Sequence, residues 1–211
     1  MNRARALAPV LVVTTMVAAV VSSLGAPLIP SIATHFAIPL SRAQWSLTAA
    51  LLVGAVSAPV MGRLGDGPWR RAALLAGVGL VAAGGVVAAL APSLGLLVVG
   101  RAFMGIGLGL VPLTMAAARD HLPVGQAGPT IALLSVCAAA GVGAGYPISG
   151  FIADRWGLAA AFWFGVVVSA IAFGLVLLVV PRSSTRTAAR LDVTGAALLA
   201  AGLVALLLAI A

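Results

Sequence analysis

A short loop near residue 65 holds the acidic and basic side chains whose spacing most clearly suggests a mechanism. Asp66 is followed by Arg70 and Arg71, and Gly62 precedes it. A carboxylate beside a helix N-terminus gains roughly 0.3–1 kcal/mol, and up to about 2 kcal/mol where it is partly buried. Because such a contact can exist in only one of two helix arrangements, it can bias a conformational equilibrium. We predict that these four residues form a latch; the alternative is an ordinary basic loop that contains one acid.

Arg101 is the charged residue that lies deepest in an apolar run. It follows the start of that run by about six residues, which is roughly 9 Å of helix. Charges at depth in a membrane-crossing helix are costly and usually face a cavity or a partner. We predict that Arg101 faces a cavity; the alternative is a side chain that reaches the outer membrane interface.

The residue inventory excludes most other kinds of reactive site. His35 and His121 lie in loops at opposite ends of the apolar runs, so they cannot share a metal ion or one catalytic triad. Cys137 is the single cysteine and cannot form an internal disulfide. The glycine run at 105–109 follows no strand, which argues against a nucleotide-binding loop. We therefore predict no enzyme activity, no metal and no cofactor.

The composition indicates whether the chain is surrounded by water or by lipid. Of 211 residues, 63% are hydrophobic and only 8% are charged, whereas soluble domains have about 25% charged residues. The charged residues are 12 arginines and 4 aspartates, which give a net charge of +8. The arginines stand in short clusters between long apolar runs, which is typical of membrane proteins and not of a nucleic-acid-binding stripe. We expect the chain to have the lipid bilayer as its partner and not to bind nucleic acid.

Seven apolar runs approach the length of about 20 residues that a membrane-crossing helix needs. The runs are continuous, so they predict helices and not alternating strands. The predicted spans are 8–32, 44–62, 72–91, 95–117, 129–152 and 158–180, with a partial seventh at 193–211. A cleaved signal peptide is the alternative for the first run, but its apolar stretch is rather long and resumes at 27–30. We predict a bundle at 1–181, a cytoplasmic linker at 182–192 and the start of a seventh helix at 193–211.

Arginine placement predicts the orientation. If the runs alternate in direction, nine arginines fall on one side, namely Arg3, Arg5, Arg63, Arg70, Arg71, Arg119, Arg182, Arg186 and Arg190. Two, Arg42 and Arg155, fall on the other side. Cytoplasmic loops carry the excess of basic residues. We predict a multi-pass protein of the cell membrane with its N-terminus in the cytoplasm.

Two segments three spans apart share one pattern. Residues 62–66 read GRLGD and residues 150–154 read GFIAD, each directly after an apolar run. The first segment is predicted to face the cytoplasm and the second the outside. Three spans repeated in opposite orientation are typical of secondary transporters. The predicted fold is all-α: a six-helix bundle of two inverted three-helix repeats plus the start of a seventh transmembrane helix.

Three motifs resemble the major facilitator superfamily, in particular the N-terminal half of a fourteen-span drug/proton antiporter. They are GRLGDGPWRR at 62–71, LVVGRAFMG at 97–105 and GVGAGYPISG at 141–150. The first resembles the family's loop after span 2, the second its Arg-x-x-x-Gly stretch in span 4, and the third the glycine–proline motif of span 5. Within the third, Tyr146 stands where the family has proline, and the proline is shifted to 147.

The resemblance implies proton-driven export of small apolar or amphipathic molecules. It implies that spans 1 and 4 line the path, with Arg101, Ser22, Ser23 and Tyr146 as candidates, and that the latch closes the cytoplasmic side. Fourteen-span relatives often carry an acid in span 1, but the aligned position here is Val21. Proton coupling is therefore implied by the resemblance without a visible proton carrier in this chain.

The glycine–proline motif permits two interpretations. The motif residues are Gly141, Gly145, Pro147 and Gly150. Gly141 and Gly145 form a Gly-x-x-x-Gly pair that lets two helices approach closely. The other interpretation is a bending or sealing element that resists leakage. Pro147 removes one helical hydrogen bond and is expected to kink the helix.

Alternating access usually needs two bundles around a shared site. We therefore expect a second transporter half, either missing from a truncated product or supplied by another chain, and we favour truncation. The alternatives to drug export are a carrier for another solute class, such as sugars, organic acids or peptides, and a non-transporting membrane fragment or assembly partner.

Overall fold

The computed structural model describes residues 3–65, 69–181, 195, 198 and 201–202. All regular structure in that part of the chain is helical. Its helices are α1 (Arg3–Ser23), α2 (Gly25–His35), α3 (Leu40–Ala43), α4 (Trp45–Gly65), α5 (Arg70–Ala89), α6 (Leu94–Gly105), α7 (Gly107–His121), α8 (Val124–Trp156) and α9 (Leu158–Val179).

Six helical segments are long and apolar enough to cross a membrane. They are Ala6–His35, Leu40–Gly65, Arg70–Ala89, Leu94–His121, Gly125–Trp156 and Leu158–Val179. The six predicted spans are confirmed, and helices continue beyond several apolar runs into the loops, most of all in α8. The predicted linker at 182–192 lies outside the described residues, as does most of the predicted seventh helix at 193–211.

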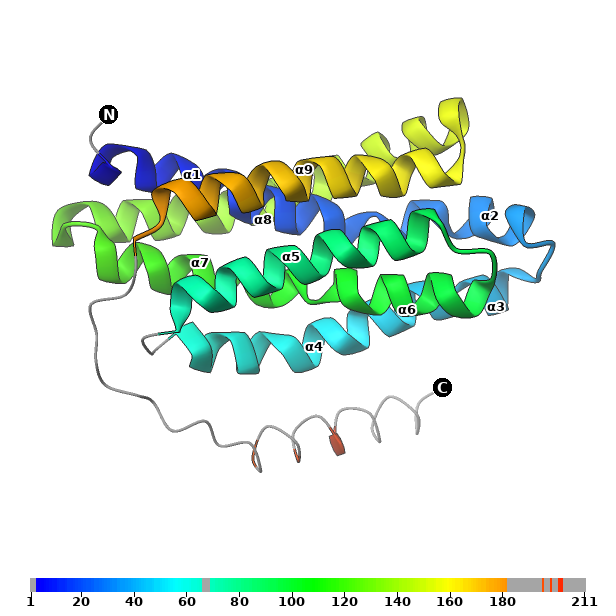
Figure 1. Ribbon diagram of the computed structural model, residues 1–211, viewed down its shortest axis with the longest axis horizontal. Helices are drawn as coiled ribbons and strands as arrows, with labels where there is room; N and C mark the ends of the chain where they lie inside the picture. Colours follow the sequence, from blue (N-terminus) through cyan, green and yellow to red (C-terminus); the bar gives the residue numbers. More distant parts are fainter. Residues whose placement is uncertain (1–2, 66–68, 182–194, 196–197, 199–200, 203–211) are drawn as a thin grey trace.

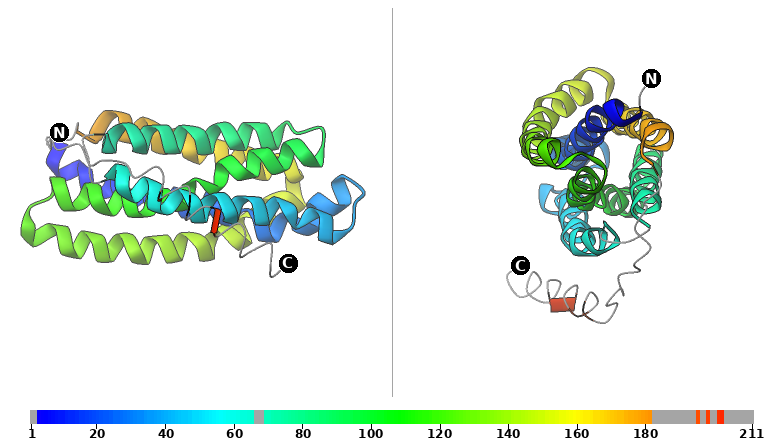
Figure 2. Two further views of the ribbon diagram at one scale, coloured as in Figure 1. Left: turned by 90° about the horizontal axis from the view of Figure 1, so that it is seen from below. Right: turned by 90° about the vertical axis from the view of Figure 1, so that its left-hand side faces the viewer.

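The six spans alternate in direction, so their connections fall at two ends (Figure 1). The start of α1, the α4–α5 and α7–α8 connections and the end of α9 lie together at the left of that view. The α2–α3, α5–α6 and α8–α9 connections lie at the right, and the left-hand view of Figure 2 shows the same division from below. Arg63, Arg70 and Arg119 therefore belong to one end of the bundle, whereas Arg42 and Arg155 belong to the other.

Helix packing follows the two-repeat organisation. If the two repeats are equivalent, span 1 corresponds to span 4 and span 2 to span 5. The contact of span 1 with span 5 then corresponds to that of span 4 with span 2. Both contacts are present: α1 packs on α8, and α6 and α7 pack on α4. The contact of span 3 with span 6, α5 with α9, maps onto itself. The fold is thus the predicted all-α bundle of two three-helix repeats.

Candidate transport site

The first span is interrupted at Leu24, between α1 and α2. The Leu24 N–H donates to Val21 O at 3.4 Å, one residue nearer than in an α-helix. Pro27 follows and has no N–H to offer to Ser23 O, four residues earlier. Pro27 thus removes one helical hydrogen bond beside a break well inside the membrane-crossing segment, where backbone polar groups become available to a cavity.

The fourth span is interrupted at Ile106, between α6 and α7. The Ile106 N–H donates to Phe103 O at 3.2 Å, again a three-residue step. Gly105 lies so close to α4 that a Cβ there would collide with Ala50 O, and a Cβ on Gly107 would stand 2.6 Å from Ser22 Oγ. The glycines on both sides of the break therefore place it directly between the second span and the first.

A pocket of about 160 Å³ lies beside these two breaks. Residues from spans 1, 2, 4 and 5 line it: Ser22, Ser23, Leu47, Leu51, Leu108, Val142 and Tyr146. Three of the four residues predicted to line the path, Ser22, Ser23 and Tyr146, are thus brought together in one pocket. Ser22 and Ser23 donate to Ala18 O at 2.7 Å and Val20 O at 2.8 Å, so both hydroxyl protons are engaged and each oxygen can act only as an acceptor.

Arg101, the fourth candidate, does not line the pocket. Its side chain is 0% exposed, so it does not reach a membrane surface. Nη1 contacts Met104 Sδ at 3.8 Å, while Nε and Nη2 have no hydrogen-bond partner in the described chain. A Cβ on Gly25 would collide with Nη2, which places the guanidinium against the break in the first span.

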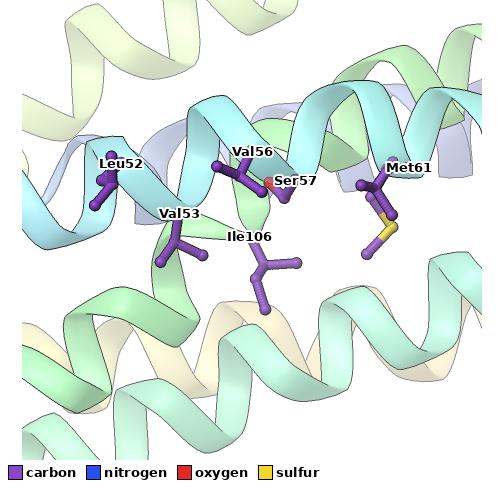
Figure 3. A pocket seen from close by; sticks show the side chains of 7 residues that line it. Leu52, Val53, Val56, Ser57, Met61 and Ile106 are labelled. Carbon is purple, nitrogen blue, oxygen red and sulfur yellow. The ribbon is translucent and has the colours of Figure 1, made fainter. Parts of the chain in front are cut away.

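A larger recess of about 370 Å³ lies along α4 (Figure 3). Its lining is Leu52, Val53, Val56, Ser57, Val60 and Met61 of α4 together with Ile106 from the break in the fourth span. The one hydroxyl in that set, on Ser57, donates to Gly54 O at 3.0 Å. This recess therefore presents an apolar surface with no polar group free to orient a ligand.

A second cluster joins four spans at the end that holds the start of α1. Arg70 forms an ion pair with Asp120 at the end of α7, and its Nε donates to Gly65 O at the end of α4. Arg71 Nη2 donates to Leu177 O of α9 at 2.7 Å. The start of α5 is thus fastened to spans 2, 4 and 6.

The other two latch residues remain predictions. Asp66 lies outside the described residues. A Cβ on Gly62 would meet no atom within 4 Å, so nothing in the described part of the chain packs on that position.

Two side chains that join α7 to other spans, Asp120 and Thr114, were not predicted from the sequence. Asp120 stands between Arg119 and His121 at the end of an apolar run, and its rarity as one of 4 aspartates was a usable signal. Thr114 shares a hydrogen bond of 2.7 Å with Thr15, and both are fully buried. No spacing rule links residues 15 and 114, so that contact had no signal in the sequence.

The glycine–proline motif of span 5 packs against the first span. A Cβ on Gly141 would stand 2.9 Å from Met16 O, and one on Gly145 would stand 2.9 Å from Val20 O. Gly150 has open space around it. α8 continues as one helix through Pro147, whereas the first and fourth spans are interrupted at Leu24 and Ile106.

No group of three or more metal-binding side chains occurs among the described residues. His35 ends α2 and His121 ends α7, at opposite ends of the bundle (Figure 1).

Comparison with known proteins gives the family. A family model described as Major Facilitator Superfamily matches residues 11–211. The chain belongs to the Major Facilitator Superfamily. Members of this superfamily are transporters and not enzymes, they act on small-molecule substrates, and the chain is accordingly a multi-pass membrane protein.

Two curated bacterial proteins illustrate its relatives. An uncharacterized MFS-type transporter of Bacillus subtilis, YvkA, is 30% identical over 198 residues, which cover 88% of this chain and 45% of that protein. Multidrug resistance protein Stp of Mycobacterium tuberculosis is 28% identical over 169 residues, which cover 79% of this chain and 32% of that protein. The chain therefore spans less than half the length of these relatives.

A solved structure supports the fold. The human organic anion transporter MFSD10 superposes with a TM-score of 0.67 at 21% sequence identity, covering 94% of this chain and 54% of that one. At this identity the likeness establishes the superfamily fold and leaves the substrate to other arguments.

Proposed function

We propose that the full-length protein containing this chain is a secondary active transporter that exports small apolar or amphipathic compounds, driven by proton entry. The observation that carries the proposal is the pocket shared by Ser22, Ser23 and Tyr146, in which three hydroxyls lie among apolar side chains of four spans. Such a lining suits ligands with a large apolar body and few polar groups. The similarity to a multidrug resistance protein supports export as the direction.

The proposed organisation has three parts. Residues 1–181 form the N-terminal bundle, 182–192 a cytoplasmic linker and 193–211 the start of a seventh span. A second half completes the path. The arginine-rich end faces the cytoplasm, because arginine gathers on that side of the cell membrane.

The proton carrier is proposed to lie in that second half. The two described aspartates, Asp120 and Asp154, lie at the ends of α7 and α8 and not in the middle of a span. A proton relay in a membrane needs a titratable group near the transport path.

The latch is proposed to control the cytoplasmic opening. Arg70 and Arg71 fasten the start of α5 to spans 2, 4 and 6, which supports a role of this end of the bundle in controlling the opening. The docking partner of Asp66 would be a helix N-terminus in the second half.

Dye efflux tests the proposed function. Cells that lack their own efflux pumps are loaded with the neutral dye N-phenyl-1-naphthylamine and express the full-length gene product or an empty vector. We expect faster efflux with the protein, and we expect a protonophore to abolish the difference. Equal efflux in the two strains would contradict the assignment to drug-type export.

A further inference from the structure

Among the described residues, Arg101 is the fully buried charged side chain, and its guanidinium makes no ion pair. Its side chain is 0% exposed, and two of its three nitrogens lack any hydrogen-bond partner. Arginine stays protonated at neutral pH, so the group is a fixed positive charge. An uncompensated buried ion is strongly unfavourable, and one retained at depth usually has a functional partner.

The described residues provide no anion for it. Asp120 is engaged by Arg70 at one end of the bundle. Asp154 lies in the last turn of α8, at the opposite end. The weak acceptor Met104 Sδ, at 3.8 Å, is the contact that the guanidinium makes. Because the bundle covers Arg101 completely, an anion from outside could reach it only after a neighbouring side chain moves.

The guanidinium lies one side chain away from the pocket. The position that a Cβ on Gly25 would take is in contact with Arg101 Nη2 and lies 3.0 Å from Leu47 Cδ1. Leu47 also forms part of the pocket wall. Rotation of this leucine side chain is therefore the local change that would open the pocket toward Arg101.

We propose that the pocket selects amphipathic organic anions, with Arg101 as the group that binds the anionic head. This inference rests on the proposed transport function and specifies its substrate class. The apolar body of the ligand would lie on Leu51, Leu108 and Val142. A carboxylate, sulfonate or phosphate head would displace Leu47 and accept hydrogen bonds from Nε and Nη2, since planar guanidinium matches such groups.

The same charge disfavours lipophilic cations. Two like charges repel strongly in a medium of low dielectric constant, and no described carboxylate lies nearby to offset that repulsion. The Tyr146 residue lines the pocket, and its hydroxyl makes no hydrogen bond within the described chain, so it is a free donor in addition to Arg101. Both free donors favour an acceptor-rich head group.

A matched set of probes tests the proposal in the full-length protein. Three dansyl amides carry the same five-carbon chain and end in a carboxylate, an ammonium or a methyl group. Transport is measured in proteoliposomes with the membrane potential clamped at zero, so that probe charge adds no driving force. We expect the carboxylate probe to be transported at least tenfold faster than the ammonium probe. In Arg101→Gln that ratio should fall to about one while transport of the methyl probe persists.

Two further variants separate charge recognition from damage to the fold. Arg42→Gln makes the same chemical change at an exposed position of the short helix α3 and should leave the ratio unchanged. Leu47→Ala retains Arg101 and opens the route to it, so it should increase the ratio. The anion proposal would be overturned if the carboxylate and ammonium probes were transported equally fast. It would also be overturned if neither Arg101→Gln nor Leu47→Ala changed the ratio of their transport rates. Transport of none of the three probes would instead overturn the proposed function.

Discussion

At the scale of single residues, the ion pair of Arg70 and Asp120 is the contact whose loss should be most damaging. The arginine side chain is 4% exposed and the aspartate side chain 31%. Asp120→Asn removes the charge that compensates a buried guanidinium, and leaving a buried polar group poorly satisfied costs about 1–3 kcal/mol. We expect the free energy of unfolding to fall by about that amount, measured by thermal unfolding of the full-length protein in detergent.

Asp154 provides the matched control for that substitution. It is exposed and makes no ion pair in the described part of the chain. Asp154→Asn should therefore change stability by no more than about 0.5 kcal/mol. The double variant Arg70→Gln with Asp120→Asn should be less destabilised than the sum of the two single variants, because the two residues act as a unit. Strict additivity would show that the pair contributes nothing.

At the scale of elements, the contact between α1 and α8 depends on a glycine face. A Cβ on Gly145 would collide with Ser23 Oγ and stand 2.9 Å from Val20 O, which belongs to the backbone and cannot rotate away. Overpacking of this kind typically costs about 1–3 kcal/mol. We expect Gly145→Ala to lower stability by that amount and to slow transport, because the collision is with a residue that lines the pocket.

Gly150 on the same helix tests that interpretation. No atom lies within 4 Å of the position that its Cβ would take. Alanine is a better helix former than glycine by about 0.8–1.0 kcal/mol. Gly150→Ala should therefore leave transport intact and keep or slightly raise stability. Equal loss in the two variants, measured by unfolding and by dye efflux, would mean that the motif acts by flexibility and not by close packing.

The sequence could predict where the membrane spans lie but not where the helices inside them are interrupted. Hydropathy alone placed all six spans, because a bilayer imposes one length on every crossing helix. The sequence predicts a kink at Pro147, but α8 continues as one helix there, and the interruptions of the first and fourth spans occur at Leu24 and Ile106. Their positions depend on where neighbouring helices allow the backbone to shift, which is a property of packing and not of local propensity.

At the scale of the whole molecule, the candidate site is less predictable from the sequence than the fold, because its contacts also depend on how the spans pack. Ser22, Ser23 and Tyr146 could be proposed as path residues from motif and polarity, and the structure gathers them in one pocket. Arg101 is buried against residues of other spans, and Arg70 and Asp120, which form an ion pair, also belong to different spans. Sequence spacing has no rule for such contacts across the bundle, because the order of packing of the spans determines them.

Orientation in the membrane is also a property of the whole molecule, and it is open to a direct test. Arg119 belongs to the arginine-rich end of the bundle and Arg42 to the other end, and both residues are exposed. In a full-length background without other cysteines, including Cys137, each is replaced singly by cysteine. We expect a membrane-impermeant maleimide to label Arg42→Cys in intact cells and Arg119→Cys only after permeabilisation, because basic ends stay in the cytoplasm. The reverse pattern would place the Arg70–Asp120 cluster outside the cell and remove the cytoplasmic latch. Labelling of both in intact cells would contradict the alternation of the spans itself.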